Sequence, residues 1–350
     1  MALRCGIVGL PNVGKSTIFN ALTASSVPAE NYPFCTIDPH VGIVELPDPR
    51  LEKLAEIFKP EQITHASVEF TDIAGLVRGA SKGEGLGNQF LGQIRQVTAI
   101  IHVVRCFEDP DVVHVDGTVD PKRDIDTVDT ELIFADLDSL ERRLKRFAKG
   151  AKSGDKEAIL HFATAEKLVE LLNEGKPARA GDWTQEELGS VEDAQLITHK
   201  PVLYVCNVDE SGMDGDNEFV RIVRARAEAE HAGIVIICGQ LEAEISELDP
   251  EDKLAFLEDL GLTEPGLNRL ARQTYGLLGL HTYFTAGPKE IRAWTFHSGW
   301  RAPQCAGVIH TDFERGFIKA EVYAIPDLLE HGSETALKGV GKLRVEGKAY

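Results

Sequence analysis

Residues 9–16, GLPNVGKS, have the types and the spacing that bind phosphate groups. They fit the pattern G-x-x-x-x-G-K-[ST], in which Gly9 and Gly14 let the backbone form a nest of N–H groups. Lys15 would reach the outer phosphates of a nucleotide, and the Ser16 hydroxyl would ligate Mg²⁺. Because an apolar run precedes the pattern and helical spacing follows it, a chance glycine-rich turn is the weaker interpretation. We therefore expect six residues at the nucleotide: Asn12, Val13, Gly14, Lys15, Ser16 and Thr17.

Two further stretches carry side chains that would complete a metal site. DIAG, residues 72–75, ends an apolar run, where a D-x-x-G motif supplies an aspartate for the Mg²⁺ shell and a glycine N–H for the γ-phosphate. We therefore expect Asp72 at the metal and Gly75 at the nucleotide. Thr36, in NYPFCTIDP (31–39), is the candidate switch threonine that closes on Mg²⁺; the alternative is a surface-turn threonine. Its neighbour Cys35 is either a redox-sensitive thiol or an unreactive loop thiol.

The stretch VLYVCNVDE, residues 202–210, ends in residues that would meet a base. GTPases have Asn-Lys-x-Asp here, and the aspartate accepts two hydrogen bonds from guanine. Glu210 carries its carboxylate one methylene further out, so we expect ATP to bind more tightly than GTP. A GTPase with relaxed base specificity is the alternative. The expected base site comprises Asn207, Val208 and Glu210, together with Cys238, Gly239 and Gln240.

The elements that must position these residues alternate between apolar runs and amphipathic stretches. Strand-like runs cover 40–46, 66–74, 99–107, 201–208 and 233–240, which predicts a mainly parallel sheet with helices on both faces. Two amphipathic helices over 130–152 and 155–175 predict an antiparallel hairpin. Its expected apolar stripes are Leu132, Leu137, Leu140 and Leu144 on the first helix and Ile159, Phe162, Leu168 and Leu171 on the second. Short strands after 281 predict a small α+β domain. The predicted α/β fold thus has a P-loop domain (1–126 and 199–280), an inserted helical hairpin (127–198) and a tail domain (281–350).

This order of motifs, with a helical hairpin before NVDE and a small tail domain, closely resembles the YchF or Obg-like ATPase family. Members of that family are translation-factor-class P-loop NTPases that bind ribosomes. The resemblance spans nearly the whole chain, and the NxxE variant is its most specific mark. It implies a Mg²⁺-dependent, ATP-hydrolysing switch protein and a tail that is a TGS domain of the β-grasp type. Because family members usually continue about a strand beyond KLRVEGKAY, we expect the closing strand of that domain to be missing here.

Several residues bear on the rate of hydrolysis. Leu76 follows DIAG where Ras-type GTPases have a water-orienting glutamine, and leucine forms no hydrogen bond, so slow intrinsic turnover is expected. Pro11 would crowd an arginine supplied by a partner. The resemblance points to His114, in the acidic loop 108–121, as the water-positioning residue; an ordinary surface histidine is the alternative. Asn12 is similar to the asparagine of NTPases that recruit K⁺, so K⁺ is expected as well.

The net charge of -19 argues against a protein that coats nucleic acid with its whole surface, and we expect no DNA partner. Ribosomal RNA is implied by the resemblance, and cations concentrate toward the hairpin tip, either as a phosphate-contacting patch or as a solvated helix face. They are Arg142, Arg143, Lys145, Arg146, Lys149 and Lys152, with a second mixture of Lys289, Arg292, Trp294 and Arg301 in the tail.

The composition also limits the expected cellular location and the competing functions. No apolar run approaches the ~18 residues of a membrane span, and the six cysteines lie without CxxC spacing, so we expect free thiols in a reducing cytoplasm. A metabolic kinase and a non-hydrolysing scaffold are the competing functions. A kinase would need an acceptor site and a lid with catalytic arginines, which the sequence does not suggest.

Overall fold

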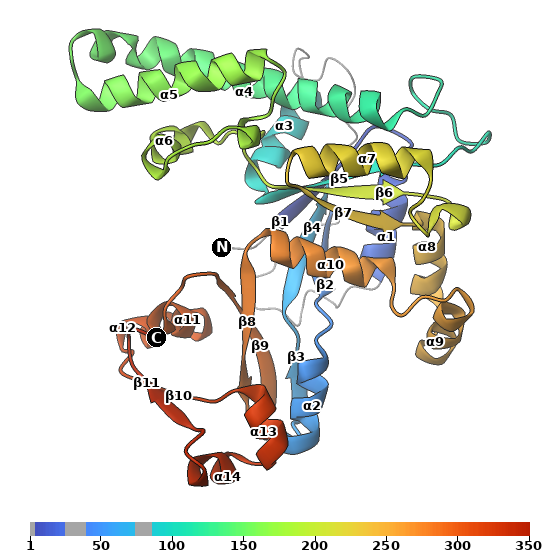
Figure 1. Ribbon diagram of the computed structural model, residues 1–350, viewed down its shortest axis with the longest axis vertical. Helices are drawn as coiled ribbons and strands as arrows, with labels where there is room; N and C mark the ends of the chain where they lie inside the picture. Colours follow the sequence, from blue (N-terminus) through green and yellow to red (C-terminus); the bar gives the residue numbers. More distant parts are fainter. Residues whose placement is uncertain (1–3, 25–39, 74–85) are drawn as a thin grey trace. The chain divides into compact units, whose positions relative to one another are not determined.

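The computed structural model describes residues 4–24, 40–73 and 86–350, which form two compact units. The first comprises Met1–Val44 and Glu69–Gln273, and the second comprises Glu45–Val68 and Thr274–Tyr350 (Figure 1). The predicted division placed 45–68 in the nucleotide-binding domain, and this is wrong. The reason is that β3 (Gln62–Thr64) pairs in parallel with β9 (Glu290–His297) and α2 (Pro49–Phe58) packs on the same strand.

Within the described residues, six strands form the main sheet. Every residue of β5 and β6 is buried, as their almost wholly apolar sequences predict for central strands. β1 pairs in parallel with β4 and β5, and the β5–β6 and β6–β7 pairs are parallel too. The predicted α/β fold with a mainly parallel sheet is therefore confirmed. The strand order is β2 (Val41–Glu45), β4 (Ser67–Asp72), β1 (Arg4–Val8), β5 (Ala99–Arg105), β6 (Val202–Asn207) and β7 (Gly233–Ile237).

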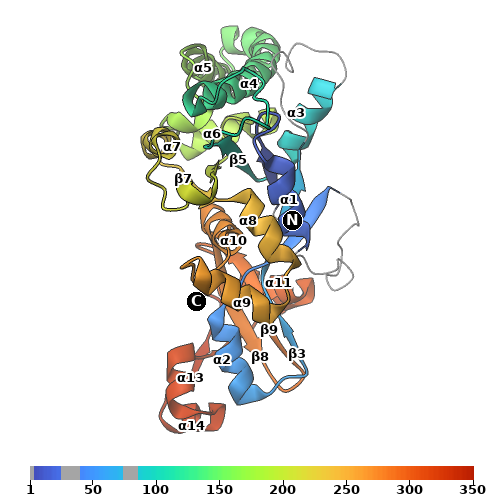
Figure 2. The same cartoon turned by 90° about the vertical axis from the view of Figure 1, so that its right-hand side faces the viewer.

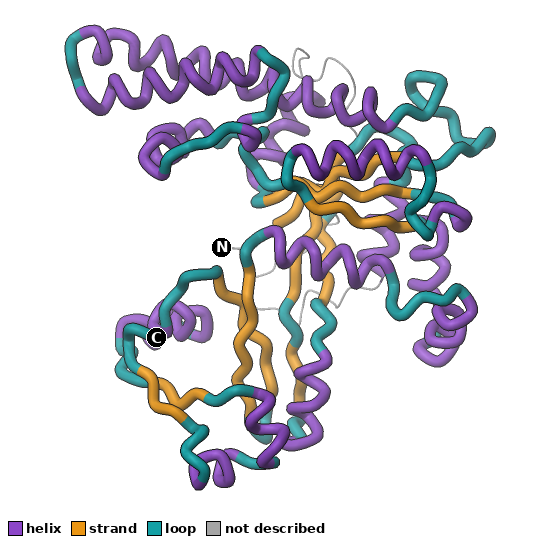
Figure 3. The backbone as a smooth tube through the Cα atoms, viewed as in Figure 1, coloured by secondary structure: helices purple, strands orange, loops and turns teal. Residues whose placement is uncertain are grey.

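Helices cover both faces of this sheet, as Figures 1 and 2 show. One pair is α1 (Lys15–Ala24) with α8 (Gly239–Glu247), and another is α7 (Glu218–Ala229) with α4 (Pro121–Lys152). Figure 3 shows the strands running between these helices. Because the central strands are parallel, the loops after β1, β5, β6 and β7 leave the sheet at one edge. Outside the hairpin and the segment that follows it, the other helices described between β4 and β8 are α3 (Leu86–Gln96), η4 (Glu210–Gly212), α9 (Pro250–Asp259) and α10 (Gly266–Leu277).

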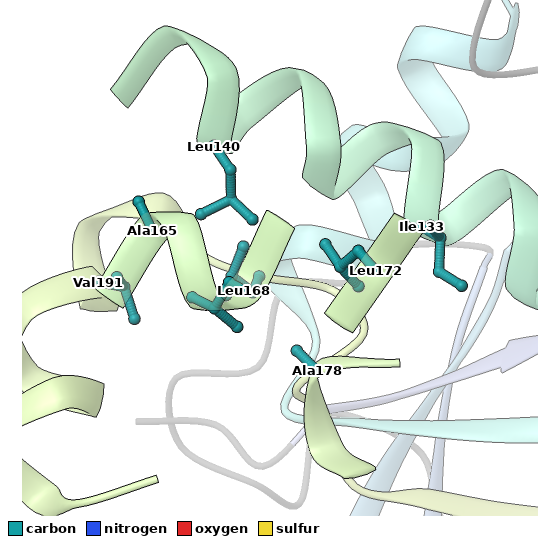
Figure 4. Close-up of a cluster of buried hydrophobic side chains, with 8 residues drawn as sticks. Ile133, Leu140, Ala165, Leu168, Leu172, Ala178 and Val191 are labelled. Carbon is teal, nitrogen blue, oxygen red and sulfur yellow. The ribbon is translucent and has the colours of Figure 1, made fainter. Parts of the chain in front are cut away.

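The hairpin is formed by α4 and α5 (Lys156–Asn173). α4 begins at Pro121 rather than 130, since Asp120 caps it by accepting from the Arg123 N–H and proline suits the first helical position. Figure 4 shows Leu140 and Leu168 in the apolar cluster between the helices, with Leu172 and Val191 beside them. Ile159 is 45% exposed and does not belong to this core. The chain returns to β6 through η2 (Ala178–Ala180), α6 (Gln185–Val191) and η3 (Glu192–Ala194).

The second unit combines short strands and short helices. β8 (Leu280–Ala286) and β9 form an antiparallel hairpin, and β3 adds a parallel edge to it. β10 (Ala320–Val322) pairs in antiparallel with β11 (Arg344–Glu346), and both strands are short, as expected for the part of the chain after 281. The helices of this part are α11 (Ala302–Ile309), α12 (Thr311–Arg315), α13 (Ile325–His331) and α14 (Glu334–Gly339). Within the part of the chain that the structure describes, we find no helix with the length and hydropathy of a membrane span.

Candidate functional site

The loop between β1 and α1 has the backbone that its glycines predict. A Cβ on Gly9 would lie 2.6 Å from the carbonyl oxygen of Val103, and Gly14 has a φ of +88°, so both positions require glycine. Asn12 also has a positive φ, of 62°, which asparagine tolerates better than most residues. Because α1 begins at Lys15, the N–H groups of Lys15, Ser16 and Thr17 lie in its first turn and have no partner within the helix. Such a helix start binds anions.

These residues line a cavity of about 1000 Å³. Four segments that are distant in sequence meet there: the loop after β1, the loop after β5, the turn after β6 and the turn after β7. Val13 is buried beneath it and is not part of the lining. The other predicted nucleotide-binding residues of the described chain do line it, namely Asn12, Gly14, Lys15, Ser16, Thr17, Asn207, Val208, Glu210, Cys238, Gly239 and Gln240.

Asn207 connects the two ends of this cavity. Its Nδ2 donates to the carbonyl of Val13 at 2.9 Å, and its Oδ1 accepts from the N–H of Gly239 at 2.9 Å. The residue is 4% exposed, and a Cβ on Gly14 would lie only 2.0 Å from its Nδ2. Asn207 also lines the cavity at the end where we expected it to contact the base, and each end of its amide bonds a protein group. It therefore positions the phosphate-binding loop against the turn after β7.

Lys15 and Asp72 form the polar pair at the phosphate end. The Lys15 Nζ lies 2.8 Å from Asp72 Oδ1, and both side chains are largely buried. With the Ser16 hydroxyl in the first turn of α1, the donor set is a hydroxyl and a carboxylate, which are the hard oxygen ligands that Mg²⁺ prefers. The residues present thus fit this ion. Thr36, Gly75, Leu76 and Cys35 lie outside the described residues.

The base end of the cavity is acidic and partly apolar. Asp209 caps the turn of η4, because its Oδ1 accepts from the Gly212 N–H and the Ser211 hydroxyl, both at 2.9 Å. Glu210, the next residue, is exposed and lines the cavity. Burial raises the pKa of the Cys238 thiol, so this side chain is protonated and uncharged at neutral pH. Cys5, Cys106 and Cys206 are also free and buried, in agreement with the expected free thiols.

The sequence did not lead us to predict a role for Arg105, which shapes the side of the cavity that the loop after β5 forms. Arg105 is 1% exposed and donates to the carbonyls of Phe107, Val112 and Asp109, at 3.2, 2.9 and 3.3 Å. These bonds fix the first half of the loop after β5. The residues of this loop that line the cavity were not predicted either; they are Phe107, Glu108, Asp109, Pro110 and Val112. An arginine that ends a continuous apolar strand was the available signal, since a buried guanidinium needs acceptors nearby.

His114 does not line the cavity in this structure. It is 5% exposed, its Nε2 lies 2.9 Å from Asp124 Oδ2, and its Nδ1 accepts from the Asp116 N–H at 3.1 Å. The interpretation as an ordinary surface histidine is therefore wrong. A water-positioning role would require the ring to leave this place.

The cations of the hairpin separate into two groups. Arg143 is buried and donates to Asp193 and to the carbonyl of Ser190, so the expectation that it contacts RNA is wrong. It lies on the face of α4 that packs against the returning chain. Lys145, Arg146, Lys149 and Lys152 are exposed, as is Arg142, which pairs with Asp138 at 3.1 Å. In the second unit, Arg292 stacks on Trp294, whose Nε1 donates to Thr285.

Comparisons with known proteins agree with this geometry. A family model described as "50S ribosome-binding GTPase" matches residues 4–149, and the model YchF-GTPase_C, described as a protein of unknown function, matches residues 280–350. The chain is 54% identical to "Ribosome-binding ATPase YchF" of Bacillus subtilis (strain 168), over 100% of this chain and 96% of the relative. It is 55% identical to the protein of that name from Haemophilus influenzae, with the same coverage.

A solved structure extends the likeness to three dimensions. "Structure of the Schizosaccharomyces pombe YchF GTPase" superposes with a TM-score of 0.89 at 36% identity, covering 99% of this chain and 94% of that one. The match includes both units described above, and it supports the same mixed α/β architecture. With identities above 50% over the full chain, this protein belongs to the YchF family.

Proposed function

We propose that this protein is a Mg²⁺-dependent nucleoside triphosphatase that prefers ATP, turns over slowly and associates with the ribosome in the cytoplasm. One observation carries the proposal: a single cavity of about 1000 Å³ joins the start of α1 and Lys15 to Glu210 and the turn after β7. Its two ends match the two ends of a nucleotide. The names of the relatives, "Ribosome-binding ATPase YchF", support the same activity and partner.

At the phosphate end, different residues would contact the phosphates and the metal ions. The N–H groups at the start of α1 would bind the β-phosphate, and Lys15 would turn from Asp72 to the β- and γ-phosphates. Ser16, Asp72 and Thr36 would hold Mg²⁺, which neutralises charge on the phosphate oxygens. Leu76 offers no group that orients water, which supports slow intrinsic turnover. Asn12, whose Nδ2 donates to Val113, keeps its side-chain oxygen for the K⁺ that we also propose.

At the base end, Glu210 supports ATP over GTP. A carboxylate one methylene further out than aspartate cannot accept from both guanine N1–H and N2 amine without displacing the turn. A charge-assisted hydrogen bond contributes about 1.5–3 kcal/mol, so losing one lowers guanine affinity about ten- to a hundredfold. Since Asn207 already bonds Val13 and Gly239, the adenine amine would use backbone carbonyls near Val208 and Cys238.

Comparative titration tests this proposal. Fluorescent ATP and GTP are titrated into the wild type, Glu210→Asp and Lys15→Ala, and hydrolysis is followed in the same samples. We expect the wild type to favour ATP, Glu210→Asp to gain guanine affinity, and Lys15→Ala to lose hydrolysis. Equal or tighter GTP binding by the wild type would overturn the ATP preference.

Two other functions have specific support. The solved relative is named a GTPase, so a GTPase with relaxed base specificity is the second candidate. Leu76 favours the third, a nucleotide-dependent RNA-binding scaffold without hydrolysis. A single-turnover assay with and without ribosomes separates the scaffold from the enzyme, because the scaffold would bind nucleotide and release it unchanged.

A further inference from the structure

The loop between β5 and α4 is held in two halves by different groups. Arg105 fixes residues 107–112 through three backbone carbonyls. The following segment, 113–117, is held through His114, which contacts Asp124 on the first turn of α4 at 2.9 Å. Arg123 steadies that carboxylate, because its Nη2 donates to Asp124 Oδ1 at 3.1 Å. Loss of the His114–Asp124 contact would therefore leave the three bonds of Arg105 intact.

The ring of His114 is fully engaged in this arrangement. Because the Asp116 N–H donates to Nδ1, that nitrogen carries no proton, and Nε2 must carry it and donate to Asp124. Neither nitrogen is then available to a water molecule. His114, Asp116 and Asp124 also place possible ligand atoms within 4.8 Å of one another. A cation there would compete with Arg123, which lies 3.1 Å from Asp124 and 3.6 Å from Asp116, so we propose no metal.

Around His114, the solvent exposure of the side chains is the reverse of what their residue types usually show. Val113 and Val115 are 73% and 50% exposed, whereas the histidine between them is buried. The same segment touches the phosphate-binding loop, since Asn12 Nδ2 donates to the carbonyl of Val113 at 3.0 Å. The turn ends at Gly117, which has a φ of +82° and open space around it. A rotation of 113–116 about Gly117 would release the ring beside the phosphate-binding loop and would exchange a buried histidine for exposed valines.

We propose that Asp124 is a positioning residue that controls the access of His114 to the cavity. The hydrogen bond between Asp124 and His114 holds the ring away from the nucleotide, and opening of the segment 113–117 delivers it. This inference rests on the proposed hydrolysis, because His114 would act on the attacking water. Asp124 never touches the nucleotide; it acts only through His114.

The test removes the charge of Asp124 and keeps its shape. In Asp124→Asn, we expect kcat to rise roughly tenfold with KM unchanged, because weakening a charge-assisted bond populates the open segment. Hydrogen exchange measured by NMR should show roughly tenfold less protection at the amides of Asp116 and Gly117, which donate to His114. The amide of Val112, which donates to Asp109 in the half held by Arg105, should be unaffected.

Two further variants complete the design. His114→Ala should abolish the gain when combined with Asp124→Asn. Asp126→Asn is the matched control, since it breaks an ion pair of the same helix with Arg226 and leaves the loop untouched. If Asp124→Asn does not fold, Arg123→Gln loosens the same carboxylate from the other side and should act in the same direction.

The outcomes are distinct. Faster exchange with unchanged or lower kcat would overturn the proposal, since the released ring would then not serve hydrolysis. Unchanged exchange and unchanged kcat would overturn it too. If the wild type and every variant bind nucleotide without turning it over, the proposed hydrolysis fails. If the wild type hydrolyses and Asp124→Asn is no faster, only the role of Asp124 fails.

Discussion

A substitution of Asn207 can show whether this residue positions the phosphate-binding loop or contacts the base. In Asn207→Asp, the donor that faces the Val13 carbonyl becomes an oxygen, and two oxygens cannot remain 2.9 Å apart without repulsion. We expect ATP and GTP affinities to fall together, about ten- to a hundredfold, because one buried hydrogen bond is lost and its acceptor is left unpaired. Isothermal titration of both nucleotides measures this.

The control is Asn173→Asp, which makes the same chemical change at an exposed position at the end of α5. It should leave both affinities unchanged. A selective loss of one nucleotide in Asn207→Asp would mean that Asn207 contacts the base, as the sequence alone suggested.

Residue types in a known spacing were predictable, whereas contacts between distant segments were not. The segment 9–16 encodes its own geometry, so Gly9, Gly14 and Lys15 could be placed from sequence. Arg105 could not, because its acceptors are carbonyls of an irregular loop that no periodicity describes. His114 was expected near the cavity, but its burial depends on Asp124, which lies in a first helix turn that begins before the predicted helix start at residue 130.

Among the elements, α4 joins the hairpin to the sheet through buried charges. Arg226 of α7 pairs with Asp129 of α4 at 2.7 Å, and Arg179 of η2 pairs with Glu230 at 2.9 Å. Tyr204 of β6 donates to the same Glu230 at 3.1 Å. Helical periodicity gave the two long helices, but not these pairs, because a charged side chain in a helix is usually solvent-facing. The root of the hairpin is thus fixed to the central strands.

β5 carries a buried titratable group beside this network, which predicts sensitivity to acid. Burial, reinforced by Arg179, lowers the pKa of His102 to about 3. The unfolded chain takes up that proton near pH 6.5, so between about pH 6.5 and 3 the unfolded state binds more protons than the folded state. The free energy of unfolding should therefore fall as the pH falls below about 6.5, by up to about 1.4 kcal/mol per pH unit.

Urea unfolding of the wild type and His102→Gln between pH 7.5 and 5 checks this prediction. Trp183, in the segment that returns from the hairpin to β6, reports on the first unit when Trp294 and Trp300 are phenylalanine in both proteins. The comparison uses the slope of the free energy against pH, which a uniform destabilisation by glutamine does not change. Equal slopes would show that His102 is not the source.

At the scale of the whole molecule, the division of the chain was the least predictable feature. Residues 45–68 follow a strand of the main sheet, and sequence order favoured keeping them there. β3 pairs instead with β9, more than two hundred residues later, in the register Gln62 with Glu290. Such a pairing depends on a partner strand that local patterns do not identify, whereas the sheet of the first unit follows from repeated strand–helix alternation.

Because the whole molecule is acidic, ribosomal RNA binding can be tested on the exposed cations of α4, which we call the hairpin stripe. Arg142, Lys145, Arg146, Lys149 and Lys152 recur at three- and four-residue steps and therefore share one face of α4. Arg143, one step from Arg142, falls on the buried face. In a chain with a net charge of -19, phosphate contacts must be local, since the molecule as a whole repels RNA.

We expect replacement of Lys145, Lys149 and Lys152 by alanine to lower ribosome cosedimentation and to make its salt dependence shallower by roughly two units of slope, because each lost phosphate contact removes about 0.7–0.9. The matched control replaces by alanine three exposed lysines of the second unit, Lys53, Lys319 and Lys348. The control and the hairpin variant then have the same net charge. Because both variants are equally acidic, a general increase in repulsion would weaken them alike. Only a local contact predicts that the hairpin variant loses affinity and slope while the control keeps both, so equal losses would exclude the stripe as the RNA-binding surface.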